Sequence, residues 1–308
     1  MESAALIGLV VMVLYAAAAP ALGRRLPPAT ATRLLVAGNV VVAAGISFIL
    51  AVVAFTWVGQ APEVAELGPW SSATLRATSP IPAAPAAISA FLVTGAAVSL
   101  TLAAVRRIRS LVRINRACRG LGDPHRAVVL NDPRPDAFTT PRPTGRIVIT
   151  AGLLRVLDDD EKRAVLAHET AHLTHNHAWW KLAADLSAAA NPLLRPAAGS
   201  IATAVERWAD EDAARTVGDR RLVATTVGRV ALLKTGAAPM PGAGPAATDG
   251  DVVARVQALL EPAPRRRPLT LVAMVLLVIA IAGPAAAVQH IGEGLFENAA
   301  GNAAGPVV

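Results

Sequence analysis

The chain has 308 residues, of which 54% are hydrophobic and only 17% are charged, and its mean hydropathy is +0.47. These values exclude an ordinary soluble composition and make membrane-spanning segments the first expectation. The net charge of +7 could indicate nucleic-acid binding, but the arginines flank apolar segments, so anchoring to anionic lipid explains them and no direct nucleic-acid binding is expected.

Four apolar windows contain no Asp, Glu, Lys or Arg, and each is long enough to cross a bilayer, which takes about 20 residues. They predict membrane-spanning helices at about 4–22, 34–58, 85–105 and 269–289. Buried helices of a soluble protein are the alternative, but such helices rarely run this far without a charge. The first window is not a signal peptide, because Glu2 precedes it and Arg24 follows it, the reverse of the charge order that a signal peptide needs.

Basic residues gather on one side of these spans. They are Arg24, Arg25, Arg33, Arg106, Arg107, Arg109, Arg113, Arg116, Arg265, Arg266 and Arg267. The loop at 59–83 carries Glu63 and Glu66 but only one arginine. The positive-inside rule therefore predicts a multi-pass protein of the cell (plasma) membrane, with residues 106–268 in the cytoplasm and a short exterior tail at 290–308.

Residues 106–268 are numerous enough to form a domain with its own core. Helices are predicted at 105–119, 158–190, 200–217 and 251–260, strands at 127–130 and 146–150, and a flexible loop at 235–250. Asp158 and Glu161 have the spacing of a capping box, and Gly218 is a good residue to end a helix. Residues 186–205 are apolar but interrupted by Pro192 and Arg195, so a pair of helices on the membrane surface is expected rather than a fifth span.

The run His168-Glu169-Thr170-Ala171-His172 matches the pattern HExxH. Residues four apart share one face of a helix, so the imidazoles of His168 and His172 can bind a single zinc ion. Glu169 leans toward the same site, where it would act as the general base toward a water molecule that zinc activates.

A catalytic zinc usually has three protein ligands and one open position. Glu206 is the best candidate for the third ligand of one zinc ion per chain. Asp210 lies four residues on, and we expect it to accept a hydrogen bond from a ligand imidazole. The alternative is a solvated charged helix, because other charges lie nearby at Arg207, Glu211, Asp212 and Arg215. The upstream HExxH favours the ligand interpretation.

Two more histidines follow the motif, and neither is predicted to bind the metal. His175 could line the cleft or pair with a charge, whereas His177 is expected to point elsewhere, at the surface or near the membrane. Trp179 and Trp180 are expected at the lipid interface.

Two further parts of an active site are less well marked in the sequence. An oxyanion-stabilising side chain is common in zinc peptidases, and nothing selects among the candidates Arg207, Arg215, Arg220 and Arg221. Substrate peptides are expected beside an edge strand, for which Ile147, Val148 and Ile149 are the candidates.

The stretch from Arg134 to His177 (RPDAFTTPRPTGRIVITAGLLRVLDDDEKRAVLAHETAHLTHNH), with the later ExxxD at Glu206, resembles the catalytic core of HtpX-like and BlaR/MecR-type membrane zinc peptidases. The resemblance covers roughly 125–262, including RVQALLEP at 255–262. It implies a mainly α protein whose cytoplasmic α+β zincin (gluzincin-like) domain is inserted between the third and fourth spans. That order is the BlaR/MecR order, but without an SxxK motif or room for a penicillin-binding sensor domain, β-lactam sensing is not expected.

We therefore expect a membrane-integral zinc metalloendopeptidase that acts on protein or peptide substrates. The resemblance alone implies a cytoplasmic regulator, such as a transcriptional repressor, as one substrate class; a membrane protein is another. A catalytically silent signalling or scaffold protein of the same fold is the main alternative. A transporter or channel is disfavoured because the spans carry no internal charge. The oligomeric state, the activating signal and self-cleavage are left open.

Overall fold

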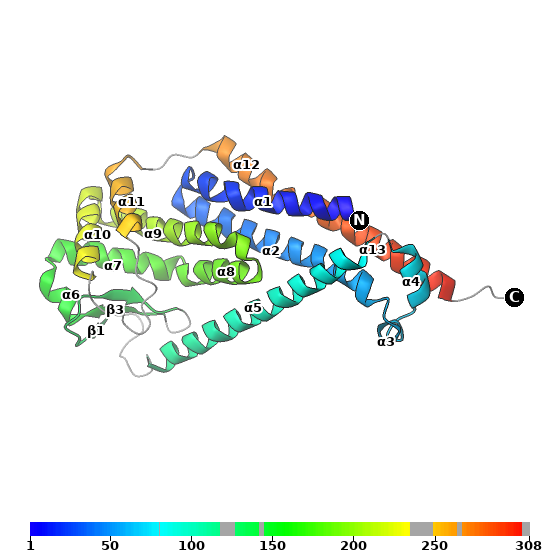
Figure 1. Ribbon diagram of the computed structural model, residues 1–308. Helices are drawn as coiled ribbons and strands as arrows, with labels where there is room; N and C mark the ends of the chain where they lie inside the picture. Colours follow the sequence, from blue (N-terminus) through cyan, green and yellow to red (C-terminus); the bar gives the residue numbers. More distant parts are fainter. Residues whose placement is uncertain (80, 118–126, 142–144, 235–248, 264–266, 304–308) are drawn as a thin grey trace.

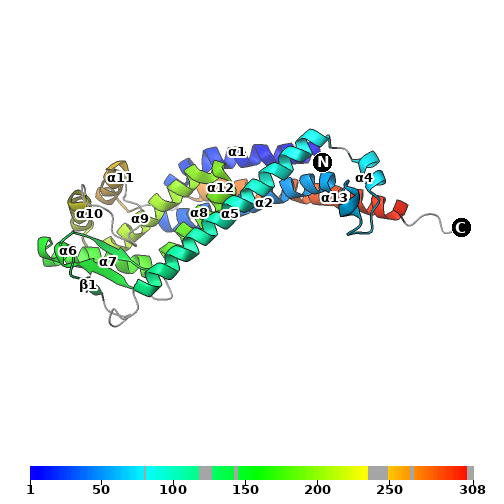
Figure 2. The same cartoon turned by 60° about the horizontal axis from the view of Figure 1, so that its bottom comes forward.

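The structure is a computed structural model, and it describes residues 1–79, 81–117, 127–141, 145–234, 249–263 and 267–303. The molecule is elongated and mainly helical: long apolar helices form one end, and a small sheet with shorter helices forms the other (Figure 1). The N-terminus and the described end of the last helix lie away from the sheet (Figures 1 and 2). The predicted loop at 235–250 falls almost wholly outside the described residues.

Four helical segments are long and apolar enough to cross a membrane. They are α1 (Glu2–Arg24), α2 (Pro28–Val58), α5 (Ala83–Ala117) and the consecutive pair α12 (Pro268–Ile279) and α13 (Ala282–Ala303). Each extends beyond the predicted span. The helix predicted at 105–119 is the continuation of α5, and the tail predicted at 290–308 is helical as far as Ala303.

The segment between α2 and α5 is folded rather than an open loop. It contains α3 (Pro62–Ala65) and α4 (Ser72–Thr78). The rings of Phe55, Trp70 and Phe296 pack together with centroid distances of 5.1–5.9 Å, which fixes this segment to α13. Aromatic clusters of this kind bury large apolar areas, so the end of the bundle away from the sheet has a core of its own.

Within the described part of the chain, the sheet has three strands, β1 (Val128–Leu130), β2 (Ala137–Thr139) and β3 (Ile147–Thr150), in the order β1-β3-β2. β3 runs parallel to β1 and antiparallel to β2. The prediction that 146–150 forms an edge strand is therefore wrong, because β3 is paired on both sides. Ile147, Val148 and Ile149 lack a free backbone edge for a substrate peptide, and β2, which was not predicted, is an edge strand instead.

The remaining helices lie at the sheet end of the molecule or extend from it along the apolar bundle (Figure 1). They are α6 (Ala151–Val156), α7 (Asp159–Thr174), α8 (His177–Ala190), α9 (Arg195–Val217), α10 (Arg220–Lys234) and α11 (Asp249–Leu260), with a 3-10 turn, η1 (Pro192–Leu194), between α8 and α9. The capping box of Asp158 and Glu161 is confirmed, and Gly218 ends α9 with a φ of 81°.

One predicted helix, at 158–190, is in fact two. Asn176 adopts a left-handed conformation with a φ of 52°, which separates the end of α7 from the start of α8. Asparagine is one of the few residues that tolerate this conformation. The break matters for the site described next, because His177 directly follows it.

Candidate metal centre

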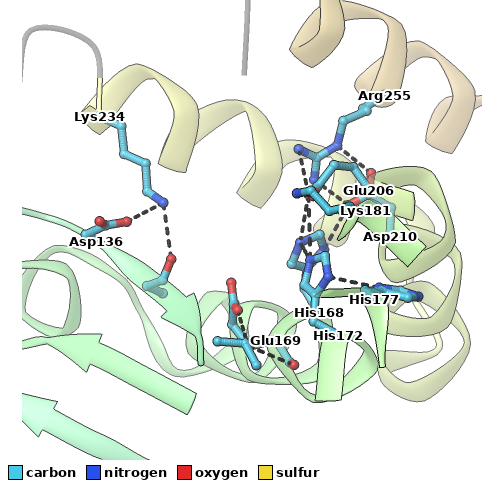
Figure 3. Close-up of polar contacts among 12 residues, drawn as sticks. Asp136, His168, Glu169, His172, His177, Lys181, Glu206, Asp210, Lys234 and Arg255 are labelled. Atoms are coloured by element: carbon cyan, nitrogen blue, oxygen red, sulfur yellow. Dashed lines mark hydrogen bonds and ion pairs between the residues drawn. The ribbon is translucent and has the colours of Figure 1, made fainter. Parts of the chain in front are cut away.

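The HExxH motif lies in the second half of α7 and faces the middle of α9. The two helices come close because small side chains line their contact: Ala164 on α7 and Ala213 and Ala214 on α9 are all buried. This close approach brings Glu206 and Asp210 of α9 to the histidines of α7 (Figure 3).

Three side-chain atoms form a compact triangle. The Nε2 atoms of His168 and His172 are 3.1 Å apart, and Glu206 Oε2 lies 3.6 Å from the first and 3.7 Å from the second. Ligand atoms bound tetrahedrally to zinc at 2.0–2.1 Å are about 3.3 Å from one another. The donor set therefore fits one metal ion, with two neutral imidazoles and one carboxylate.

The outward-facing nitrogen of each imidazole also has a partner. His168 Nδ1 lies 3.0 Å from Asp210 Oδ1, the partner that the sequence predicted. His172 Nδ1 lies 2.9 Å from Nδ1 of His177, which the sequence did not predict. Partners of this kind fix the tautomer and the orientation of metal-binding imidazoles. If both Nε2 atoms bind metal, His172 donates from Nδ1, so His177 must accept.

The sequence predicted that His177 lies at the surface or near the membrane, but the residue is buried. Because the left-handed conformation of Asn176 breaks the helix, the His177 ring turns inward, where it is only 1% exposed and its centroid lies 4.9 Å from that of Trp208. The His175 ring stacks on Trp208 with a centroid distance of 4.4 Å and pairs with the Asp212 carboxylate. Pairing with a charge was one of the two roles expected for His175.

Burial and charge set the protonation of the site in the metal-free protein. Burial lowers the pKa of His168, but the carboxylates of Asp210 and Glu206 outweigh this and raise it to about 9. Burial alone would raise the pKa values of these carboxyls, but the neighbouring histidines and cations hold both below their usual range. His168 therefore carries a proton at neutral pH that a metal ion has to displace.

Two cations lie against the ligand carboxylate, and neither was among the predicted candidates. Arg255 of α11 makes two hydrogen bonds of 2.7 Å to Asp210 and lies 3.6 Å from Glu206 Oε2. Lys181 of α8 lies 3.3 Å from Glu206 Oε1 and is one-third exposed. Of the arginines considered from the sequence, Arg215 and Arg220 pair instead with Asp212 and Glu211.

Replacing Arg255 by methionine is expected to destabilise the metal-free protein by about 1.5–3 kcal/mol, because the buried Asp210 carboxylate loses its two hydrogen bonds from the guanidinium and keeps only the His168 imidazole as a neighbouring cation. Thermal or denaturant unfolding in detergent would measure the loss. Arg215→Met is the matched control, since it breaks an exposed ion pair and should cost no more than about 1 kcal/mol. Equal effects of the two substitutions would contradict the importance of the buried pair.

His177 makes the metal-free protein sensitive to acid. Burial, reinforced by the neighbouring imidazoles of His172 and His175, lowers its pKa from 6.5 to about 3. Between pH 6.5 and pH 3, His177 is therefore protonated in the unfolded chain and neutral in the folded chain. This contribution to stability is complete above pH 6.5 and is lost as the pH falls toward 3, at about 1.4 kcal/mol per pH unit.

His177→Asn should flatten this part of the pH dependence, because the Asn Oδ1 can still accept from His172 but does not titrate. Unfolding of chelator-treated protein, followed from pH 7 down to about pH 4, measures the slope. His290→Asn, at an exposed position on α13, is the control and should leave the slope unchanged. The same slope in His177→Asn as in the unsubstituted protein would contradict the assignment.

Glu169 lies beside the triangle but outside it. Its carboxylate accepts a hydrogen bond of 2.6 Å from the Thr139 hydroxyl on β2, and its side chain is largely buried. The carboxylate is thus held at the junction of α7 and the edge strand (Figure 3). Sequence patterns gave no signal for Thr139, because β2 is too short to predict.

Comparisons with known proteins agree with this site. Residues 105–235 match the model of Peptidase family M48. A protein named Protease HtpX homolog from Methanothermobacter thermautotrophicus is 43% identical over 44 residues, which are 14% of this chain and 17% of the relative. Proteins of the same name from Aeropyrum pernix and Tropheryma whipplei are 48% and 43% identical over 46 and 47 residues. These are 15% of this chain in both cases, and 14% and 16% of the relatives.

The aligned segments thus span less than a fifth of the relatives' own lengths. No solved structure matches the chain significantly. The segment that matches the peptidase family contains the His-His-Glu group, and candidate membrane spans lie before and after it.

Proposed function

We propose that this protein is a membrane-integral zinc endopeptidase. The observation that carries the proposal is the triangle of His168, His172 and Glu206 with a separate carboxylate, Glu169, next to it. Two imidazoles and a carboxylate with an open fourth position are a typical catalytic zinc site. A purely structural zinc site would have four protein ligands. A scaffold would not need a carboxylate beside the metal ligands that does not itself bind the metal.

Each residue of the site has a chemical task in this proposal. His168, His172 and Glu206 hold the zinc ion, which when bound activates water and polarises a carbonyl group. Glu169 accepts the proton of the attacking water and delivers it to the departing amine as the C–N bond breaks. Asp210 and His177 orient the two imidazoles from outside.

The free edge of β2 is the place for the substrate backbone. Among the described residues, β2 pairs with β3 on one side and has no strand on the other. Lys234 fixes the start of β2 through Asp136 and the carbonyl oxygen of Ala137. A peptide that adds to this edge as an extended strand would run past Glu169, because Thr139 of the same strand contacts that carboxylate.

The location and the substrates follow from charge and resemblance. The arginines beside the apolar helices support a plasma-membrane protein with its peptidase domain in the cytoplasm. The resemblance to BlaR/MecR-type proteins supports a cytoplasmic regulator, such as a repressor, as one substrate class, and a membrane protein is the other.

The proposal is tested on the full chain in lipid nanodiscs. Elemental analysis should find one zinc ion per chain, and a dye-quenched unfolded protein should be cleaved. A chelator should stop the cleavage, and added zinc should restore it. A protein that contains zinc but cleaves neither this probe nor itself would favour the silent scaffold, and a protein without zinc would overturn the metal assignment.

Thr139 offers a finer test of how Glu169 is oriented. Thr139→Val removes the hydroxyl that donates to Glu169 and is expected to lower kcat by about 10–100-fold with little change in KM, since a hydrogen bond to a charged carboxylate is worth about 1.5–3 kcal/mol. Thr139→Ser keeps the hydroxyl and should restore the rate. The control is Thr216→Val on α9, whose hydroxyl is exposed and bonds only to its own helix. A Ser variant as slow as the Val variant would contradict the role.

A further inference from the structure

Both ligand-bearing helices continue into one helical hairpin. α8 begins just after the HExxH helix, η1 turns the chain, and the first half of α9 returns to Glu206. We call residues 177–205 the ligand hairpin. It lies alongside α1, α2 and α5, pointing from the sheet end toward the chain termini (Figures 1 and 2). Its position relative to these candidate spans decides whether it lies on a membrane or in it.

The tip of the hairpin reaches far along α1. Asn191 Nδ2 donates to the sulfur of Met12 at 2.9 Å, and Asn191 is buried. Met12 lies twelve residues before Arg24, the first charge after the apolar part of α1. At 1.5 Å per residue, the tip is therefore about 18 Å from that charged end.

A second contact gives the same depth independently. Ala204, at the end of the hairpin nearest Glu206, packs on Leu26 and Ala31, where α1 turns into α2. Leu194, the N-cap of α9 at the tip, precedes Ala204 by ten residues and therefore lies about 15 Å further from that turn. Both values are about half of the 30 Å thickness of a bilayer's hydrocarbon core.

The hairpin also shares its core with the candidate spans. Its buried residues Leu194, Ala197 and Ile201 belong to one cluster with Tyr15 and Leu35 of α1 and α2. α8 has only 14 residues, too few to cross a bilayer. The hairpin therefore has the depth and the packing of a membrane segment without the length of a complete span.

The charges of the hairpin are compatible with partial insertion. Asp185, in the middle of α8, pairs with Arg107 of α5, at the level where the third apolar window ends. Arg195 is exposed near the tip, and a long arginine side chain can keep its guanidinium at the headgroups while its stem lies among acyl chains. Trp179 is half exposed in the first turn of α8, close to the metal centre, where the inferred membrane surface would place an aromatic belt.

We infer that the ligand hairpin is re-entrant: it enters the bilayer from the side of the metal centre, reaches about the middle and returns, with lipid acyl chains as the partner of its exposed tip. This replaces the expectation of helices on the membrane surface. It rests on the membrane assignment of the four apolar helices and not on catalysis.

The inference also bears on the substrate class, where it rests on the proposed function. Glu206 follows Ala204 by two residues, so the metal centre lies level with the loop between α1 and α2. Arg24 at the end of α1 and Arg25 in the loop mark the headgroup layer. Peptide bonds close to the membrane surface are then the ones within reach.

Spin labelling tests the insertion with three exposed leucines of one protein. In a Cys118→Ser background, single cysteines replace Leu193 at the tip, Leu92 on α5 and Leu232 on α10, which are 51%, 48% and 76% exposed. Each carries a nitroxide, and the protein is reconstituted into vesicles of phosphatidylcholine and phosphatidylglycerol. Collisions with oxygen indicate the hydrocarbon, and collisions with a water-soluble nickel chelate indicate water.

The label at 193 should lose nickel collisions and gain oxygen collisions as the label at 92 does, whereas the label at 232 should show the reverse. A label at 193 that behaves like the label at 232 would overturn the re-entrant hairpin. A label at 92 that also contacts nickel would overturn the membrane assignment, and the inference with it. If Leu193→Cys fails to fold, Pro196→Cys provides a second exposed site near the tip. Loss of peptidase activity in any variant changes none of these outcomes.

Discussion

Glu169→Gln is expected to keep its full metal content and to lose peptidase activity by about 10²–10⁴-fold in kcat. The carboxylate is not one of the three donor atoms, so the metal does not need it. Glutamine has the same shape, and its oxygen can still accept the hydrogen bond from Thr139. It cannot take a proton from water, so only the chemical step is affected.

Elemental analysis and cleavage of the quenched probe, measured on the same sample, separate the two properties. Asp160→Asn is the control, because it makes the same change on the same helix, at an exposed residue that pairs only with Arg163. A Glu169→Gln protein that cleaves at the unsubstituted rate would refute the role of general base.

Glu206→Ala is expected to remove the metal. The substitution takes away the only anionic donor of the triangle and leaves Lys181 and Arg255, two cations, facing the remaining imidazoles. Metal affinity should fall by more than the roughly 10–100-fold that changes in the outer partners cost. Because zinc binding also stabilises the fold, the variant should no longer gain thermal stability on zinc addition.

Competition with a chromophoric chelator measures this affinity without any substrate. Glu261→Ala, at an exposed position after α11, is the control and should bind zinc like the unsubstituted protein. Stoichiometric zinc in Glu206→Ala after dialysis would show that another group is the third ligand.

The residues of the triangle could be predicted because helices make spacing informative. His168 and His172 are one turn apart on α7, and Glu206 and Asp210 repeat that spacing on α9. Each pair therefore lies on one face of its helix. The contact of Thr139 with α7 could not be predicted in this way. It depends on a three-residue strand, which is too short to show a periodic pattern.

His177 escaped prediction for a different reason. Five residues after His172 on an unbroken helix, it would face away from the site, and only the left-handed conformation of Asn176 turns it back. One backbone dihedral thus decides whether this histidine is a surface residue or a partner of a ligand.

The apolar spans were predictable because charge-free windows are a direct signal. Their ends were not, because α5 and α13 remain helical where their sequences become charged or polar. The sequence at 146–150 predicted a strand correctly but not its neighbours, so its place in the centre of the sheet could not be anticipated.

The uninterrupted course of α9 from Arg195 to Val217 has a consequence for regulation by the lipid environment. α9 joins the hairpin tip to Glu206 as one rigid rod, whereas the chain between α7 and α8 is broken at Asn176. A thinner or thicker bilayer that shifts the tip would then move the carboxylate relative to the two imidazoles. Zinc affinity is expected to vary with acyl-chain length, as hydrophobic mismatch is transmitted to the ion.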